Sequence, residues 1–384
     1  MRLTRHHELF RTSVRTVLER ECAAVEDWER EGAMPVHALY RTLGDEGLLG
    51  LTLPVEHGGL GLDLGYSYVW ARELGRIASG SPAMSLSVQT DIVLPLLVAA
   101  GSKRVVEDFV RPAVRGELVA ALAATEPGGG SDLAAVRTTA VPDGDDLVLD
   151  GRKAFITHGS VADFAVVLCH LSPPDTAPSG LDSLALVVVP TDLPGVRRER
   201  YTAKLGNRAC DHGSLELTGV RVPREYALGE PGSGYEWLTR VFTRERAFLA
   251  AVAASRAERS LAGALARARG RGVLGRPLAD HQAVSFALAE LDAELALVEE
   301  YTGAVFRLLD EDRPALRQAS IAKLRATRLE REAAEAQLRV HGGEGYLDGG
   351  PVERAWRDAR AGALAGGADE ALLHLIAGHL STDH

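Results

Sequence analysis

The segment Ala124-Thr-Glu-Pro-Gly-Gly-Gly-Ser-Asp132 is a polar, glycine-rich loop, and it lies where the character of the chain changes. Before about residue 120 apolar residues recur at helical spacing, as Leu18, Cys22 and Val25 do. After it, short apolar runs alternate with turn residues as far as about residue 224. The pattern becomes helical again from about residue 233. The loop therefore marks the passage from a helical segment into a β domain.

The β domain is expected to contain several short strands separated by turns. The turn signals are Asp143-Gly-Asp145 and Asp150-Gly151, and a loop is expected around Pro173, Pro174, Pro178 and Gly180. The expected strands are Leu147–Leu149, Ala154–Thr157, Phe164–Leu171, Leu184–Val189 and Ser214–Leu217.

Helical patterns flank this region on both sides. Apolar periodicity predicts helices over 66–77, 91–100, 253–270, 314–341 and 367–380. One long apolar stripe, expected to pack in a core, comprises Val284, Leu288, Leu291, Leu295, Val298 and Val305.

The predicted fold is a multi-domain α and β protein. It has an N-terminal helical domain (1–119), a small central β-barrel or β-sheet domain (120–224) and a C-terminal helical bundle (225–384). A doubly wound nucleotide-binding fold is disfavoured, because strands do not alternate with helices throughout the chain.

Composition narrows the partners of the 384-residue chain. Its net charge of −10 argues against nucleic acid, although a local cationic pocket can still bind a small anion. Three widely spaced cysteines predict a reducing compartment, with no disulfide framework and no metal cluster. The N-terminus has no apolar signal region, and no stretch is expected to approach the ~20 apolar residues of a membrane helix. We expect a cytoplasmic protein without a membrane or metal.

Four segments carry possible chemistry, the first two of them in the β domain. The glycines of 124–132 permit positive φ and close approach of a ligand, and Thr125 and Ser131 can hydrogen-bond a heteroaromatic ring or a phosphate. In Gly151–Thr157, strand alternation puts Phe155 and Thr157 on one side, where they can stack on a ring and bond its edge. An ordinary loop and a half-buried strand are the simpler alternatives.

The other two segments lie in the C-terminal region. Arg271 opens a segment that ends at Gln282, and its guanidinium can bind a pyrophosphate. His341-Gly-Gly-Glu-Gly-Tyr346 is followed by the segments 357–360 and 365–370. Taken singly, these are a solvated arginine near a turn and a helix, glycine loop, helix arrangement.

Together, in this order and at these separations, the four segments resemble the acyl-CoA dehydrogenase family. The first is similar to that family's TEPxxGSD signature. Gly58–Leu62, Val220–Pro223 with its VRVP run and Pro351–Arg360 with its PVERxxRDAR run also fit. The resemblance spans nearly the whole chain.

The resemblance implies FAD as cofactor, bound between the β domain and the C-terminal helices. Leu122, Thr125 and Ser131 would lie along the flavin or thioester, Phe155 and Thr157 against the isoalloxazine, and Gly342 and Gly343 where the backbone approaches the dinucleotide. Glu370 would lie near the adenosine half, while Arg271 and Gln282 would come from a neighbouring subunit. An inter-subunit site implies a homo-oligomer, either a dimer or a tetramer. Arg339 stands where the family often has Gln, and Ala368 where it has Thr; both weaken a literal transfer of contacts.

The catalytic base is expected to be Glu245. Many members carry a Glu at the position of Gly366, but isovaleryl-like and long-chain-like members place the carboxylate on another helix, directly before an Arg. Glu245 directly precedes Arg246 here. The backbone amide of Gly366 would still bind the thioester oxygen, and Arg246, Thr243 and Ser131 would lie near the substrate. The simpler interpretation of Glu245 is a solvated residue between two arginines.

The implied reaction is α,β-dehydrogenation of an acyl-CoA to a 2-enoyl-CoA. Glu245 would take the α-proton, hydride would pass from Cβ to flavin N5, and an electron-transferring flavoprotein would be the acceptor. Thr243 occupies a position often acidic in acyl-CoA-using members, so an acyl or aminoacyl group on a carrier protein is an alternative substrate. The sequence is also compatible with an oxidase-type flavoprotein that reacts with O₂ and with a catalytically silent flavoprotein.

Overall fold

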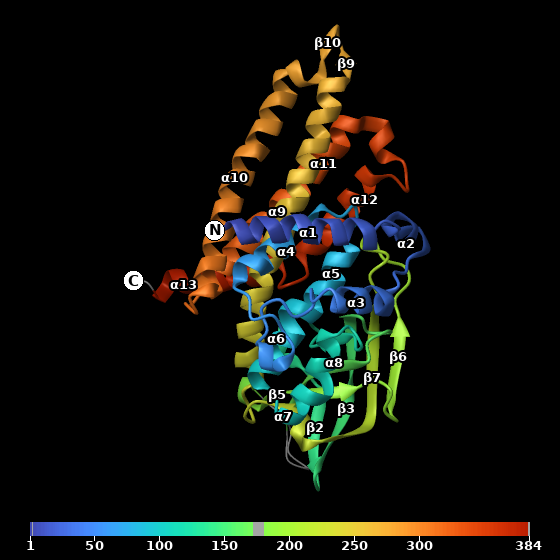
Figure 1. Cartoon of the computed structure of the whole chain (residues 1–384), viewed down its shortest axis with the longest axis vertical. Helices are drawn as coiled ribbons and strands as arrows, with labels where there is room; N and C mark the ends of the chain where they lie inside the picture. Colours follow the sequence, from blue (N-terminus) through green and yellow to red (C-terminus); the bar gives the residue numbers. More distant parts are fainter. Residues whose placement is uncertain (2, 172–179, 383–384) are drawn as a thin grey trace.

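A cluster of helices precedes the sheet in the computed structural model, which describes residues 1, 3–171 and 180–382 (Figure 1). Tyr40, Leu43, Trp70 and Leu74 form the centre of its core and have at most 1% exposure. The helices are α1 (Arg5–Glu21), α2 (Val25–Glu31), α3 (Val36–Asp45), η1 (Val55–His57), α4 (Leu64–Arg76), α5 (Ser81–Ser87), η2 (Val88–Val93), α6 (Leu94–Ala100), α7 (Lys103–Val105), η3 (Val106–Val110) and α8 (Arg111–Val114).

Helices α5, η2 and α6 form one continuous run over Ser81–Ala100. The run is 20 residues long and contains an 18-residue window with a mean hydropathy of 1.6, so by length and composition alone it could cross a membrane. The expectation that no stretch approaches this length was therefore wrong. The burial of 61% of that window inside the fold explains its composition, because a helix surrounded by protein is apolar on most sides.

The central part is an eight-stranded mixed sheet, drawn at the bottom of Figure 1. Its order is β6-β7-β3-β2-β4-β5-β8, and β1 pairs with β4 in parallel. The strands are β1 (Ala120–Ala123), β2 (Thr139–Asp143), β3 (Asp146–Thr157), β4 (Phe164–Leu171), β5 (Leu184–Pro190), β6 (Val196–Arg200), β7 (His212–Pro223) and β8 (Ala227–Leu228). Short helices η4 (Leu133–Ala135), η5 (Leu181–Ser183) and η6 (Arg224–Tyr226) interrupt them.

One predicted turn was wrong. Asp150-Gly151 lies inside β3, so the two strands expected on either side of it are a single strand. The pairing with β7 shifts register between Leu149 and Gly151, where β7 has one residue more than β3. This extra residue forms a β-bulge. A Cβ at Gly151 would lie 2.3 Å from Thr138 Oγ1, so only glycine fits there. Asp143-Gly-Asp145 does turn the chain, from β2 into β3. Pro173, Pro174 and Pro178 lie outside the described residues.

The C-terminal part is a helical bundle built around α9 (Gly234–Gly270). Buried alanines along α9 allow close contact with α11 (Leu316–His341). On another side of α9, Gly75 of α4 packs against Ser255 so closely that a Cβ at Gly75 would lie only 2.6 Å from Ser255 Cβ. The remaining elements are the hairpin β9 (Gly272–Val273) and β10 (Arg276–Pro277), η7 (Leu278–Asp280), α10 (Gln282–Asp310), η8 (Gly342–Tyr346), α12 (Pro351–Asp358), η9 (Ala359–Ala363) and α13 (Asp369–Thr382).

The predicted fold class is confirmed: helical N-terminal part, central sheet and C-terminal bundle follow one another along the chain. The apolar stripe of α10 is core packing, because Leu288, Leu295, Val298 and Val305 are buried and belong to the bundle's core. The domain limits at 119/120 and 224/225 stay predictions.

Candidate active site

Glu245 lies on α9 and faces the turn that precedes α13. Its side chain is buried, with 8% exposure. A Cβ placed on Gly366 would lie 3.9 Å from the Glu245 carboxyl carbon, so the two predicted catalytic positions are neighbours in space. The Oε2 atom of Glu245 is buried and has no hydrogen-bond partner among the residues that the structure describes. The interpretation of Glu245 as a solvated surface residue is therefore wrong.

The surroundings of Glu245 favour its protonated form. Burial raises the pKa of this carboxyl to about 7, and the charge of Asp91 acts in the same direction. The charges of Arg246 and Lys323 oppose the rise without cancelling it. A carboxylate with a pKa near neutrality is suited to removing a weakly acidic proton and retaining it.

Gly366 and Gly367 form a tight turn with φ values of +66° and +100°. Arg246 donates from Nε to the Gly366 carbonyl at 3.1 Å, and from Nη1 to Ser320 Oγ at 3.3 Å. Lys323, fully buried on α11, donates to the Gly367 carbonyl at 2.7 Å. These described contacts of Arg246 are protein contacts, so its predicted place near the substrate stays a prediction. Thr243 is also buried and donates to the Thr239 carbonyl within α9.

The glycine-rich loop is fixed to β3 by a buried ion pair that the sequence reasoning missed. Glu126 accepts from Lys153 Nζ at 2.8 Å and from Thr138 Oγ1 at 2.6 Å, and Lys153 has no exposed surface. Thr125 joins the same strand, because its hydroxyl and carbonyl bond the carbonyl and N–H of Ala154. A lysine among the apolar residues of a strand was the signal for a buried partner.

Phe155 is an exposed aromatic residue at the end of β3. It is 69% exposed with φ of +59°, beside a register shift between Lys153 and Ile156, and its ring centroid lies 5.6 Å from that of Tyr201. Thr157 is half-buried, and its hydroxyl lies 3.3 Å from His212 Nε2. Burial alternates through this segment, with Ala154 and Ile156 inside, so Phe155 and Thr157 are the less buried positions of the strand end.

The remaining predicted ligand-binding residues fall into two groups. Leu122 is half-buried on β1, and Ser131 is exposed beyond the glycines. Arg271 and Gly342 meet at the far end of the bundle: Arg271 Nη1 lies 3.4 Å from the Val340 carbonyl and 3.3 Å from where a Gly342 Cβ would be. Gln282, Arg339 and Gly343 are exposed residues of this C-terminal group. Glu370 is also exposed, but it belongs to α13, which lies away from the hairpin end in Figure 1.

The end of the bundle that carries Arg271 lies apart from the sheet. Figure 1 shows the β9–β10 hairpin, which follows Arg271, at the top and the sheet in the lower part of the molecule. Phe155 lies near the end of β3 that faces the helices, because His158, just beyond it, bonds Ser85 of α5. Ala368 directly precedes α13, and its carbonyl accepts from the Leu372 N–H. The chain thus brings Glu245 together with Gly366, and Arg271 with Gly342, while the C-terminal group lies away from the loop and β3.

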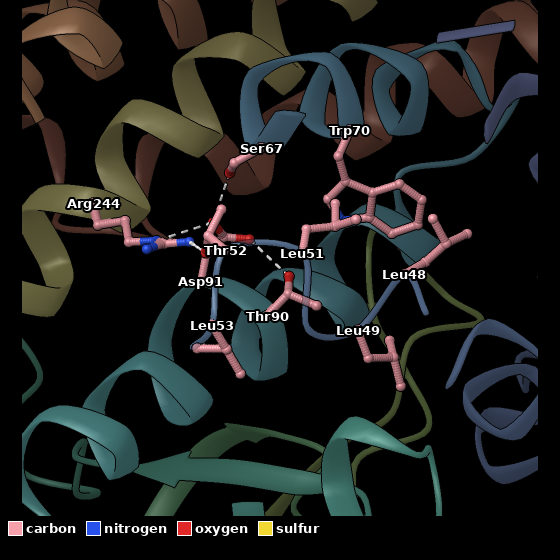
Figure 2. Close-up of a pocket in the computed structure, with 10 residues that line it drawn as sticks. All are labelled: Leu48, Leu49, Leu51, Thr52, Leu53, Ser67, Trp70, Thr90, Asp91 and Arg244. Carbon is pink, nitrogen blue, oxygen red and sulfur yellow. Dashed lines mark hydrogen bonds and ion pairs between the residues drawn. The ribbon is translucent and has the colours of Figure 1, made fainter. Parts of the chain in front are cut away.

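A buried polar cluster was also missed by the sequence reasoning (Figure 2). Asp91 on η2 accepts from the hydroxyls of Ser67 at 3.2 Å and Thr90 at 2.7 Å. Arg244, directly before Glu245, lies 3.4 Å from Asp91 Oδ1 and donates to Thr52 Oγ1 at 2.6 Å. The cavity they line has room for about one water molecule, roughly 10 Å³. Burial raises the pKa of Asp91.

A three-part chain with a buried carboxylate against a glycine turn matches one family along its length. The family models for the N-terminal, middle and C-terminal domains of acyl-CoA dehydrogenases match residues 4–117, 121–220 and 232–381. The chain belongs to the acyl-CoA dehydrogenase family, and its members are oxidoreductases acting on CH–CH bonds.

Individual relatives agree. The chain is 32% identical over 378 residues to the long-chain specific acyl-CoA dehydrogenase of Rattus norvegicus mitochondria, covering 98% of this chain and 87% of that one. The crystal structure of an acyl-CoA dehydrogenase from Geobacillus kaustophilus superimposes with a TM-score of 0.93 at 33% identity, over 98% of both chains. The prolyl acyl carrier protein oxidase AnaB superimposes with a TM-score of 0.92 at 26% identity, over 99% of this chain and 100% of that one.

Proposed function

We propose that this chain is an FAD-dependent dehydrogenase of acyl thioesters in which Glu245 removes the α-proton. The observation that carries the proposal is the environment of Glu245: a buried carboxyl with a pKa of about 7 and an unpartnered Oε2 among the described residues, set against Gly366. Buried carboxyl oxygens with a purely structural role are normally hydrogen-bonded, whereas a proton acceptor needs one oxygen free.

The residues present fit a flavin dinucleotide. Phe155 offers an exposed aromatic face, and side chains at Gly128 and Gly129 would meet no described residue within 4 Å, which leaves room for a ligand beside the loop. Arg271, exposed beside Gly342, offers a guanidinium to a pyrophosphate. When bound, FAD supplies the two-electron redox capacity that side chains lack and accepts the β-hydrogen as hydride.

The chain's own groups then have distinct tasks. Glu245 takes the α-proton and holds it, at little cost because its pKa is already near 7. The backbone N–H of Gly366 donates to the thioester oxygen as negative charge develops there. Burial around the carboxyl excludes water, so the proton is not exchanged with solvent before the hydride leaves.

Acyl-CoA is the substrate class we favour, because acyl-CoA dehydrogenases are the relatives that match along the full chain. An acyl or aminoacyl group on a carrier protein is the second candidate, supported by the similarity to AnaB and by Thr243 in place of an acidic residue. We propose an electron-transferring flavoprotein as acceptor. A homodimer or tetramer, in which the Arg271 end of one copy meets the Phe155 end of another, completes the dinucleotide site.

Anaerobic titration of the FAD-loaded protein with a panel of acyl-CoAs tests the proposal, read at the flavin band near ~450 nm. Bleaching by one of them, lost in Glu245→Gln and kept in Glu236→Gln, supports both reaction class and base. Glu236 is a matched control because it is an exposed glutamate on the same helix. If only acyl carrier proteins bleach the flavin, the carrier-protein candidate holds. If no thioester does, the proposal fails.

A further inference from the structure

A pair of consecutive glycines is the most flexible dipeptide that a chain can contain, yet Gly366-Gly367 is held at both carbonyls. The two donors come from different helices: Arg246 on α9 bonds the first carbonyl, and Lys323 on α11 bonds the second. Both side chains are charged donors, which form the stronger class of hydrogen bond. The turn beside Glu245 is therefore fixed by two cations and not by its own sequence.

Lys323 stands out among these groups. It has no exposed surface, and burying an ammonium group is costly unless it is paired and hydrogen-bonded. The charged groups that face it are Asp369 on α13, Glu245 and Arg246 on α9, and Arg331 on its own helix. Burial lowers the pKa of Lys323 to about 8, so it is still mostly protonated at neutral pH. An apolar side chain would fill this position without the cost of desolvating a charge, but it could neither donate a hydrogen bond nor carry a positive charge.

We propose that Lys323 is a positioning residue for the active site: it holds the Gly367 carbonyl so that the glycine turn keeps one conformation against Glu245, and its charge favours the ionised carboxylate. The inference rests on the proposed function in one respect, the role of Glu245 as base. The geometric part stands on the 2.7 Å bond alone. Because Gly366 and Gly367 both have positive φ and no side chains of their own, freeing the Gly367 carbonyl leaves the turn held by Arg246 at Gly366 only.

The electrostatic part has a definite sign. The groups facing Glu245 are Arg246 on the same helix, Lys323 on α11 and Asp91 on η2. Burial and Asp91 favour the protonated acid, while the two cations favour the carboxylate. Removing the Lys323 charge therefore raises the pKa of Glu245, and a base that must be ionised to act then becomes active only at higher pH.

Lys323→Met tests both parts in the FAD-loaded protein, with Arg325→Met as control. Arg325 is an exposed cation two residues along the same helix and pairs with Glu294, away from the turn. Hydrogen–deuterium exchange followed by mass spectrometry reports the turn without any turnover. We expect faster exchange in peptides covering 365–368 of Lys323→Met and unchanged exchange in Arg325→Met. Unchanged exchange in both variants overturns the positioning role.

The pH profile of flavin reduction is the second readout. We expect the acid limb of Lys323→Met to move up by about one pH unit and that of Arg325→Met to stay in place. A limb that does not move overturns the electrostatic part. If none of the thioesters tested reduces the flavin of the wild-type protein, the proposed function fails. The exchange experiment still decides the positioning role in that case. Should Lys323→Met not fold, Lys323→Gln removes the charge and keeps an N–H donor, and the same upward shift is expected.

Discussion

Glu245 should make the protein less stable as the pH rises, and Glu245→Gln should remove that loss. Folding moves the pKa of this carboxyl from 4.5 to about 7, so the folded state binds the proton more tightly than the unfolded state does. The stabilisation is complete below pH 4.5 and is lost as the pH rises through 7. Since one pKa unit corresponds to about 1.4 kcal/mol, the full loss is about 3 kcal/mol.

The magnitude can be worked for two convenient conditions. For a single group with these two pKa values, about 2 kcal/mol of the loss falls between roughly pH 5.5 and pH 8. The difference in unfolding free energy between Glu245→Gln and wild type should therefore grow by about 2 kcal/mol, in favour of the variant, across this range. Other titrating groups cancel in the difference, because both proteins share them.

Urea unfolding at both pH values, with FAD saturating, measures this difference. Glu236→Gln serves again as the control, since this exposed glutamate should give a difference from wild type that is the same at both pH values. A Glu245→Gln difference that also stays constant with pH would refute the reasoning, because it would show that the carboxyl is not protonated preferentially in the folded state.

Two further predictions concern the surroundings of the site. Arg244→Leu leaves Asp91 buried with the Ser67 and Thr90 hydroxyls but without Arg244, which should lower the free energy of unfolding by about 3 kcal/mol at neutral pH. This loss should shrink on acidification, as Asp91 takes up a proton. A loss that does not depend on pH in thermal unfolding would contradict the prediction. Phe155→Ala removes an exposed ring and should weaken FAD binding about tenfold with little change in apoprotein stability, as flavin fluorescence titration can measure; an unchanged Kd would place the flavin elsewhere.

Much of the fold could be predicted because periodicity is a local property. The strand Phe164–Leu171 was predicted with the limits that β4 has, and the stripe of α10 was assigned to the core. Asp150-Gly151 misled because its local signal is that of a turn. The bulge that replaces the turn depends on pairing with β7 and on Thr138, which are distant in the sequence.

The candidate site was predicted in part, through the resemblance. Glu245 and Gly366 are 121 positions apart in numbering, and only the family pattern suggested that they are neighbours. Lys323 and Asp91 could not be found this way, because a lone charged residue in a helical pattern is usually solvated. Their importance comes from burial by other helices, which a single sequence does not display.

The most direct test of the central claim is the rate of flavin reduction in a single turnover, measured by anaerobic rapid mixing of the FAD-loaded protein with the best acyl thioester. We predict a rate that rises with pH through about 7, the pKa of Glu245, and that is abolished in Glu245→Gln at every pH. Reduction of the flavin by Glu245→Gln at the wild-type rate would contradict the account, because the α-proton would then be leaving to another base.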